Sequence, residues 1–228
     1  MEITWFGETC IRLKGREGVV AADAYRTVVG PTGRGMTADI VTYSHPDEAE
    51  PPKPGTKAAR TAPPASDGLG IIRPTSLEAA FPLDAPGEYE IHEVLVTGVR
   101  TFRDEARGSE RGLNTAFVIE LDGLHAVHLG DVGHALTEEM LGEIGAVQVA
   151  CVPVGGALSP ARAAEMVAAL DASLVVPMPT GDDPDGALRT FLKEMNVTDP
   201  QPVAKLTVSI STVPQETTVV VLESRGKG

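Results

Sequence analysis

The chain has 228 residues, of which 42% are hydrophobic and 4% aromatic, so its core must be built mainly from aliphatic side chains. The 19 basic and 32 acidic residues give a net charge of −13, which excludes the basic footprint of a nucleic-acid-binding protein and disfavours anionic membrane surfaces. The two cysteines, Cys10 and Cys151, lie in apolar runs without metal-ligand spacing, so both are predicted to be buried free thiols.

We expect one domain over residues 1–228, because no linker or internal repeat interrupts the chain. No signal sequence precedes the first predicted strand, and no apolar run reaches the roughly 18 residues that would cross a bilayer. The sequence therefore predicts a soluble cytoplasmic protein.

The first half of the chain is typical of short strands joined by short loops, which makes neighbouring strands antiparallel. These predicted strands are residues 3–6, 10–13, 19–22, 39–43, 87–91 and 94–102. Residues 56–87 are rich in Pro and Ala and are predicted to form loops with short strands such as 70–72. A charged loop, 103–111, follows the long strand.

A hairpin opens the second half of the chain. Asp122 and Gly123 form a strong two-residue turn signal between strands 114–121 and 124–129. Beyond it the pattern alternates between strands and helices. The predicted helices are 137–144 with Thr137 as its cap, 161–170 after a Ser159-Pro160 cap, and 186–195. The predicted strands are 147–154, 174–178, 203–210 and 217–222.

Two acidic stretches follow predicted strands. Asp131 stands at the exit of strand 124–129 between glycines, where an α/β protein places either a metal ligand, a catalytic acid or an ordinary turn. His128 is predicted to point into the core, and His134 to line a cleft. The stretch 45–50, which follows strand 39–43, holds one imidazole and three carboxylates.

Several short segments occur in an order that resembles a known family, and together they cover nearly the whole chain. They are Ile3-Thr4-Trp5-Phe6-Gly7 with Thr9-Cys10, Asp23-Ala24-Tyr25, Ala38-Asp39-Ile40-Val41, Pro86-Gly87-Glu88-Tyr89-Glu90, Glu110-Arg111-Gly112 with Asn114-Thr115, His128-Leu129-Gly130-Asp131 with Gly133-His134, and Pro153-Val154-Gly155-Gly156. The chain resembles the metallo-β-lactamase superfamily, in particular its small single-domain branch similar to ascorbate-6-phosphate lactonase. The resemblance implies an α+β fold, a four-layer αββα sandwich.

The resemblance also implies seven metal-ligand positions, of which this chain keeps the family's residue at two. The family's His-x-His-x-Asp-His motif corresponds to His45, Asp47, Ala49 and Glu50, its next histidine to Arg103, its bridging aspartate to Asp131, and its last histidine to Pro179. Glu8 also stands where the family usually has a histidine. Glu8, Arg103, His134 and Pro179 are therefore expected to line the site.

Two interpretations of the function remain open. In the first, the chain no longer performs dinuclear zinc hydrolysis and binds a small molecule or a protein partner, with the Arg103 guanidinium replacing the ion beside Asp131. In the second, His45, Asp47 and Asp131 hold one weakly bound divalent metal. Because this set is rich in oxygen, Mg²⁺ or Mn²⁺ suits it better than the family's zinc.

In that second interpretation, Asp47 or Glu50 acts as the general base in the hydrolysis of an ester, lactone or phosphoester. We favour the first interpretation, because the chemistry of two zinc ions does not survive the loss of five of seven ligand positions.

Overall fold

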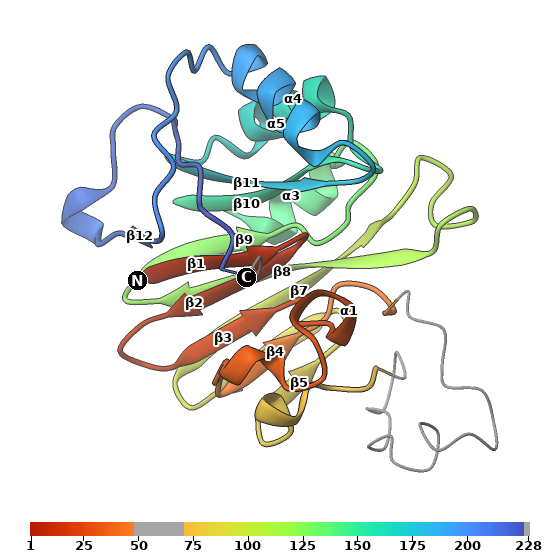
Figure 1. Ribbon diagram of the computed structural model, residues 1–228, viewed down its shortest axis with the longest axis vertical. Coiled ribbons are helices and arrows are strands. Elements are labelled where there is room, and N and C mark those ends of the chain that lie inside the picture. The colour runs from red at the N-terminus through yellow and green to blue at the C-terminus, as the bar shows by residue number, and fades with distance from the viewer. Residues whose placement is uncertain (48–70, 226–228) are drawn as a thin grey trace.

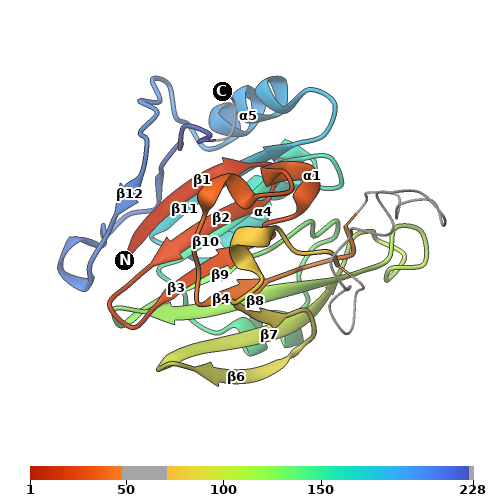
Figure 2. The same cartoon turned by 60° about the horizontal axis from the view of Figure 1, so that its bottom comes forward.

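The computed structural model describes residues 1–47 and 71–225 and contains two mixed sheets. In spatial order, the first sheet is β12 (Leu206–Thr207), β1 (Glu2–Gly7), β2 (Cys10–Lys14), β3 (Val19–Ala22), β4 (Ile40–Thr42) and β5 (Phe81–Leu83). The second sheet is β13 (Thr218–Val219), β11 (Leu174–Thr180), β10 (Val149–Gly155), β9 (Leu124–His128), β8 (Leu113–Leu121), β7 (Val94–Phe102) and β6 (Gly87–Ile91). Figure 2 shows β1 to β4 lying against the strands of the second sheet.

Strand direction follows from the length of the connections. Short turns make β1, β2 and β3 antiparallel, as predicted, and the same holds from β6 to β9. The turn between β8 and β9 has positive φ at both Asp122 (55°) and Gly123 (72°), which a two-residue hairpin of right-handed twist requires. From β9 to β11 the strands are parallel, because a helix lies in each connection.

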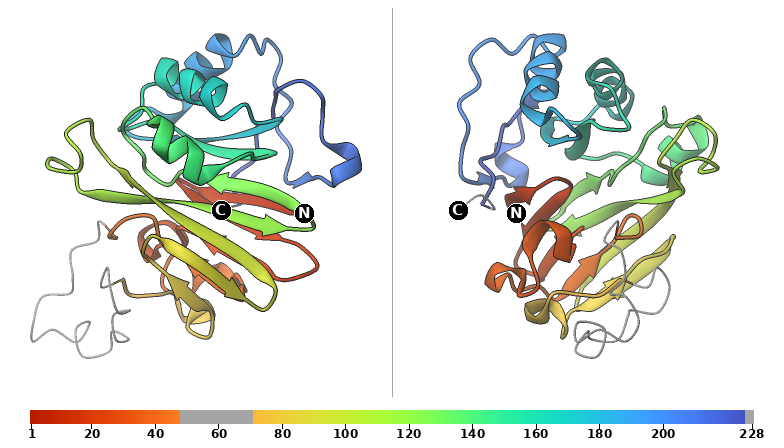
Figure 3. Two further views of the ribbon diagram at one scale, coloured as in Figure 1. Left: turned by 180° about the vertical axis from the view of Figure 1, so that it is seen from behind. Right: turned by 45° about the vertical axis from the view of Figure 1, so that its right-hand side comes forward.

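Helices cover the outer faces of both sheets (Figures 1 and 3). On the second sheet lie α3 (Glu138–Ile144), α4 (Pro160–Leu170) and α5 (Pro184–Glu194), and on the first lie α1 (Arg26–Val29) and short 3-10 turns. This is the four-layer αββα sandwich implied by the resemblance. The predicted caps are confirmed, because Thr137 and Ser159 accept hydrogen bonds from the backbone N–H groups of Met140 and Arg162.

The apolar core has one layer between the sheets and one beneath each set of helices. Alternation along β8 sends Phe117 and Ile119 into the layer between the sheets, while Ala116 and Val118 face α3 and α4. Strands of the second sheet are therefore buried on both faces, which explains their continuous apolar runs. Cys10 and Cys151 are buried free thiols, as predicted.

The sequence prediction differs from the structure mainly at the sheet edges. The predicted strands 203–210 and 217–222 shorten to β12 and β13, because each pairs with only one neighbour. Residues 71–72 form no strand, and residue 70 lies outside the described residues. The prediction missed α1, whereas β5 is a short strand within residues 56–87, where short strands were expected; it contains Pro82, which an edge strand tolerates. In the part of the chain that the structure describes, the helices are too short or too polar to cross a membrane.

Candidate functional site

A pocket of about 480 Å³ lies where strands of both sheets end. Its lining residues follow the carboxyl ends of β3 (Tyr25), β4 (His45), β9 (Asp131) and β10 (Gly156), and Thr180 ends β11. The turn between β1 and β2 adds Glu8 and Thr9, and the β7–β8 connection adds Arg103 and Arg111. A crevice at the carboxyl ends of strands is where α/β folds gather binding side chains from distant parts of the chain.

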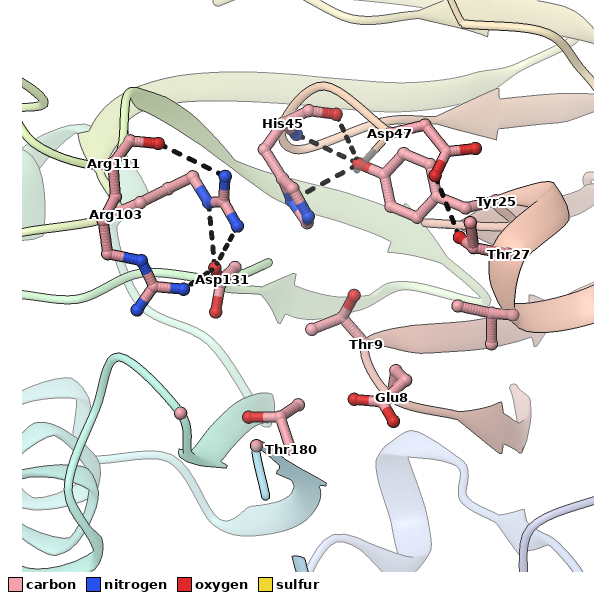
Figure 4. Close-up of a pocket in the computed structure, with 13 residues that line it drawn as sticks. Glu8, Thr9, Tyr25, Thr27, His45, Asp47, Arg103, Arg111, Asp131 and Thr180 are labelled. Atoms are coloured by element: carbon pink, nitrogen blue, oxygen red, sulfur yellow. Dashed lines mark hydrogen bonds and ion pairs between the residues drawn. The ribbon is translucent and has the colours of Figure 1, made fainter. Parts of the chain in front are cut away.

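Two arginines converge on Asp131 (Figure 4). The Nε and Nη2 groups of Arg103 both lie 2.8 Å from Asp131 Oδ2, and Arg111 Nη2 lies 3.3 Å from the same oxygen. Arg103 and Asp131 are nearly buried, with side chains 9% and 12% exposed, whereas the side chain of Arg111 is 41% exposed. The predicted contact between Arg103 and Asp131 is confirmed.

Asp131 is also held through its backbone. Its N–H group donates to Asn114 Oδ1 at 3.0 Å, and the amide of Asn114 donates to Leu129 O at 2.9 Å and Thr101 Oγ1 at 2.7 Å. Gly130 makes the turn possible, because its φ of 62° lies in the left-handed region that favours glycine. This arrangement fixes the direction in which the Asp131 carboxylate leaves β9.

Asp104 shapes the loop that carries Arg111. Its carboxylate accepts hydrogen bonds from the N–H groups of Gly108 at 2.8 Å, Glu110 at 3.2 Å and Arg111 at 2.6 Å. Partial burial raises the pKa of Asp104, but these backbone hydrogen bonds outweigh it, so the pKa lies below its ordinary value of 3.8. The ordered loop returns Arg111 to the pocket, where Arg103 Nη1 donates to Arg111 O at 3.2 Å.

A buried hydrogen-bond chain holds His45. Asp23 accepts from the Ser44 hydroxyl at 2.6 Å, and Ser44 Oγ lies 2.8 Å from His45 Nδ1. Since the hydroxyl has one hydrogen and gives it to Asp23, Nδ1 of His45 is the donor to Ser44. Tyr25 Oη donates to His45 O at 2.6 Å. Burial, reinforced by the charge of Asp23, raises the pKa of Tyr25 well above its ordinary value and keeps the phenol neutral.

The predicted metal ligands are not gathered into one cluster. Asp131 contacts the arginines, His45 contacts Ser44, and Asp47 Oδ1 accepts from Thr27 Oγ1 at 2.9 Å. Among residues 1–47 and 71–225, no three His, Cys, Asp or Glu side chains lie close enough together to hold a metal ion. Glu50, the alternative general base, lies outside the described residues.

The other predicted site residues have different places in the fold. Glu8 lines the pocket with φ of 46°, and Pro179 lines a neighbouring pocket. His134 is used structurally, because its Nε2 accepts from the Phe102 N–H group at 3.1 Å and its Nδ1 lies 2.6 Å from Ala135 O. His128 is buried in the core, as predicted, with Nε2 lying 2.7 Å from Thr9 O.

Sequence reasoning missed the roles of Arg111, Tyr25 and Thr180 in the pocket. Arg111 and Tyr25 both stand in segments that carry the resemblance, which is the signal that could have pointed to them. Their place in the pocket depends on contacts with Asp104 and His45, which the chain makes only when folded.

Comparisons with known proteins agree with the fold. A model of the beta-lactamase superfamily domain matches residues 2–179. A protein of Methanoculleus marisnigri named as a metal-dependent hydrolase is 26% identical over 205 residues, which cover 87% of this chain and 88% of that protein.

Solved structures give the same result. A metallo-beta-lactamase superfamily protein of Thermotoga maritima, named as a candidate Zn-dependent hydrolase, superposes with a TM-score of 0.68 at 28% identity and 97% coverage of both chains. A metallo hydrolase of Ignicoccus hospitalis superposes with a TM-score of 0.59 at 17% identity, covering 91% of this chain and 99% of that one. The second similarity is one of fold alone.

Proposed function

The chain belongs to the beta-lactamase superfamily, and we propose that it is a divergent member that binds a small organic anion rather than performing dinuclear zinc hydrolysis. Its relatives are named as metal-dependent hydrolases, so a metal is the group that the family implies. The observation that carries the proposal is the pair of guanidinium groups on the carboxylate of Asp131.

The residues of the pocket do not fit a pair of zinc ions. A zinc site needs three or four nitrogen, sulfur or oxygen ligands around each ion. Here Asp131 Oδ2 already accepts from three N–H groups of Arg103 and Arg111, and a divalent cation in their place would be repelled by both guanidinium charges. In this proposal the charge of Arg103 replaces that of the ion and compensates the buried carboxylate.

The same geometry supports binding of an anion. Among the described residues, the guanidinium groups of Arg103 and Arg111 both contact the one carboxylate of Asp131, so positive charge is concentrated at this end of the pocket. Within the described residues, Nη2 is the one side-chain group of Arg111 that donates a hydrogen bond, so Nε and Nη1 of this half-exposed side chain can bind a carboxylate or phosphate. Asp47 lies across the pocket (Figure 4), so an anion is attracted to the arginine end.

The metal content of the purified protein tests the first half of the proposal. Untagged protein, purified without a nickel column or chelator, is expected to contain well below one equivalent of any divalent metal by elemental mass spectrometry. Added EDTA is expected to leave its melting temperature unchanged, because Arg103 supplies the compensating charge. About one or two equivalents of zinc, manganese or iron would contradict this and restore hydrolysis of an ester, lactone or phosphoester at an altered metal site.

Anion binding tests the second half. Acetate and inorganic phosphate are titrated into the wild type, Arg111→Gln and Arg107→Gln by NMR. Arg107 lies exposed on the same loop outside the pocket lining, so it is a matched control. The Arg111→Gln variant is expected to bind about tenfold more weakly, because a charge-assisted hydrogen bond is lost, and Arg107→Gln is expected to bind as the wild type does. Equal binding by all three proteins would place the anion elsewhere.

A further inference from the structure

A second pocket, of about 400 Å³, adjoins the arginine pocket. The two share Glu8, Thr27 and Val28 in their linings, so they lie side by side along these residues. Most of the second lining is apolar and comes from β1, α1, the end of β11, α5 and the C-terminal segment. These apolar residues include Trp5, Phe6, Val28, Pro179, Leu188 and Val221.

Trp5 presents its ring, rather than its polar group, to this second pocket. Its Nε1–H group donates to the backbone oxygen of Glu8 at 2.7 Å, so the hydrogen-bonding capacity of the indole is met within the turn. The ring is only partly buried, and the side chains of Leu188 and Val28 beside it are also partly exposed. An apolar surface of this kind in a concave site gains free energy when a ligand covers it.

We infer that the ligand is an amphipathic organic anion whose charged head binds Arg111 and whose apolar chain lies in the second pocket. This inference rests on the proposed function, because it takes the arginine end as the site of the head. It goes beyond that function in naming the ligand class. Two neighbouring pockets, one lined by guanidinium groups and the other by aliphatic and indole side chains, are together complementary to such a molecule in both charge and hydropathy.

Varying the number of methylene groups in the ligand distinguishes binding in the arginine pocket from binding in the second pocket. Acetate, butyrate, hexanoate and octanoate share one head and differ only in methylene groups. Each methylene that enters the second pocket is expected to tighten binding about threefold, since its removal from water is favourable. Octyl phosphate tests the alternative head, and neutral octanamide tests the need for charge.

The protein carries its own reporter, because Trp5 is the single tryptophan. Titration of octanoate, kept below its micellar concentration, is expected to change the emission of Trp5, while acetate is expected to bind without this change. Leu188→Gln is expected to weaken octanoate binding about tenfold and leave acetate binding intact. Leu95→Gln is the matched control, because Leu95 is 46% exposed on β7 and lies outside both pocket linings.

Three results would overturn the inference. If affinity does not depend on chain length while acetate binding still depends on Arg111, the second pocket is not part of the binding site. The proposed function would then still hold. If octanoate binds equally well to the wild type and to Arg111→Gln, the charged head does not bind Arg111. The same conclusion follows if octanamide binds as well as octanoate. If acetate and phosphate also fail to bind, the proposed function falls with it. Melting temperatures of the variants show that each is folded.

Discussion

Replacing Arg103 with methionine is expected to lower the free energy of unfolding by about 3 kcal/mol. The change leaves Asp131, whose side chain is 12% exposed, with only the 3.3 Å contact from Arg111 in place of the two 2.8 Å contacts from Arg103. The cost comes mainly from a nearly buried carboxylate that has lost its partner, rather than from the lost attraction itself. Urea unfolding at neutral pH measures the loss.

Two further variants isolate the reason for this loss. Arg103→Met combined with Asp131→Leu is expected to recover part of the stability, because the nearly buried carboxylate that lost its partner is gone and the remaining Arg111 guanidinium is half-exposed to water. Arg100→Met, on the exposed side of β7, is expected to stay within about 0.5 kcal/mol of the wild type. A double variant no more stable than Arg103→Met would show that Arg103 acts through packing and not through the charge of Asp131.

Replacing Gly130 with alanine is expected to lower the free energy of unfolding by about 4 kcal/mol, which is among the largest effects of single substitutions. The φ of Gly130 is 62°, and a Cβ atom there would collide with Cβ of Ser44 and lie 2.6 Å from Asn114 Oδ1. Both neighbours belong to the hydrogen-bond network that positions His45 and Asp131, so they cannot move without loss. Thermal and urea unfolding measure the effect.

Gly142 provides the matched control for this substitution. It lies within α3, its φ is in the ordinary range, and an added Cβ would meet nothing within 4 Å. Gly142→Ala is expected to stabilise the protein by roughly 0.5–1 kcal/mol, because alanine restricts the unfolded chain and favours the helix. A Gly130→Ala variant as stable as Gly142→Ala would mean that the β9 exit is adaptable and that Asp131 is not fixed by it.

The two variants disturb the contact between Arg103 and Asp131 in different ways. Arg103 supplies the charge that lets Asp131 remain nearly buried, and Gly130 supplies the backbone geometry that points Asp131 at Arg103. Loss of either is therefore expected to weaken acetate binding as well, since the position of Arg111 depends on Asp131 and on the backbone contact with Arg103.

Features that depend on near neighbours in the chain were predictable from the amino-acid sequence. The Asp122-Gly123 hairpin, the caps at Thr137 and Ser159, and the apolar strands of the second sheet were all predictable, because turn chemistry, capping and side-chain alternation act over two to four residues. The resemblance added the four-layer fold. The contact between Arg103 and Asp131 was predictable because a guanidinium stood where the family places a metal ligand.

The remaining residues of the pocket could be placed there only from the folded structure. Arg111 reaches it because Asp104 folds the loop back, and the cleft beside Trp5 exists because α5 and the C-terminal segment meet β1. His45, Asp47 and Asp131 are also held apart from one another, because each has its own hydrogen-bond or ion-pair partner. Their spacing in the sequence does not predict these partners. The edge strands β12 and β13 are shorter than predicted, because the length of a strand depends on pairing with neighbouring strands that come from other parts of the chain. Apart from the Ser44–His45 and Asp104–Arg111 hydrogen bonds, these contacts join residues far apart in the chain, so they are set by packing and not by local propensity.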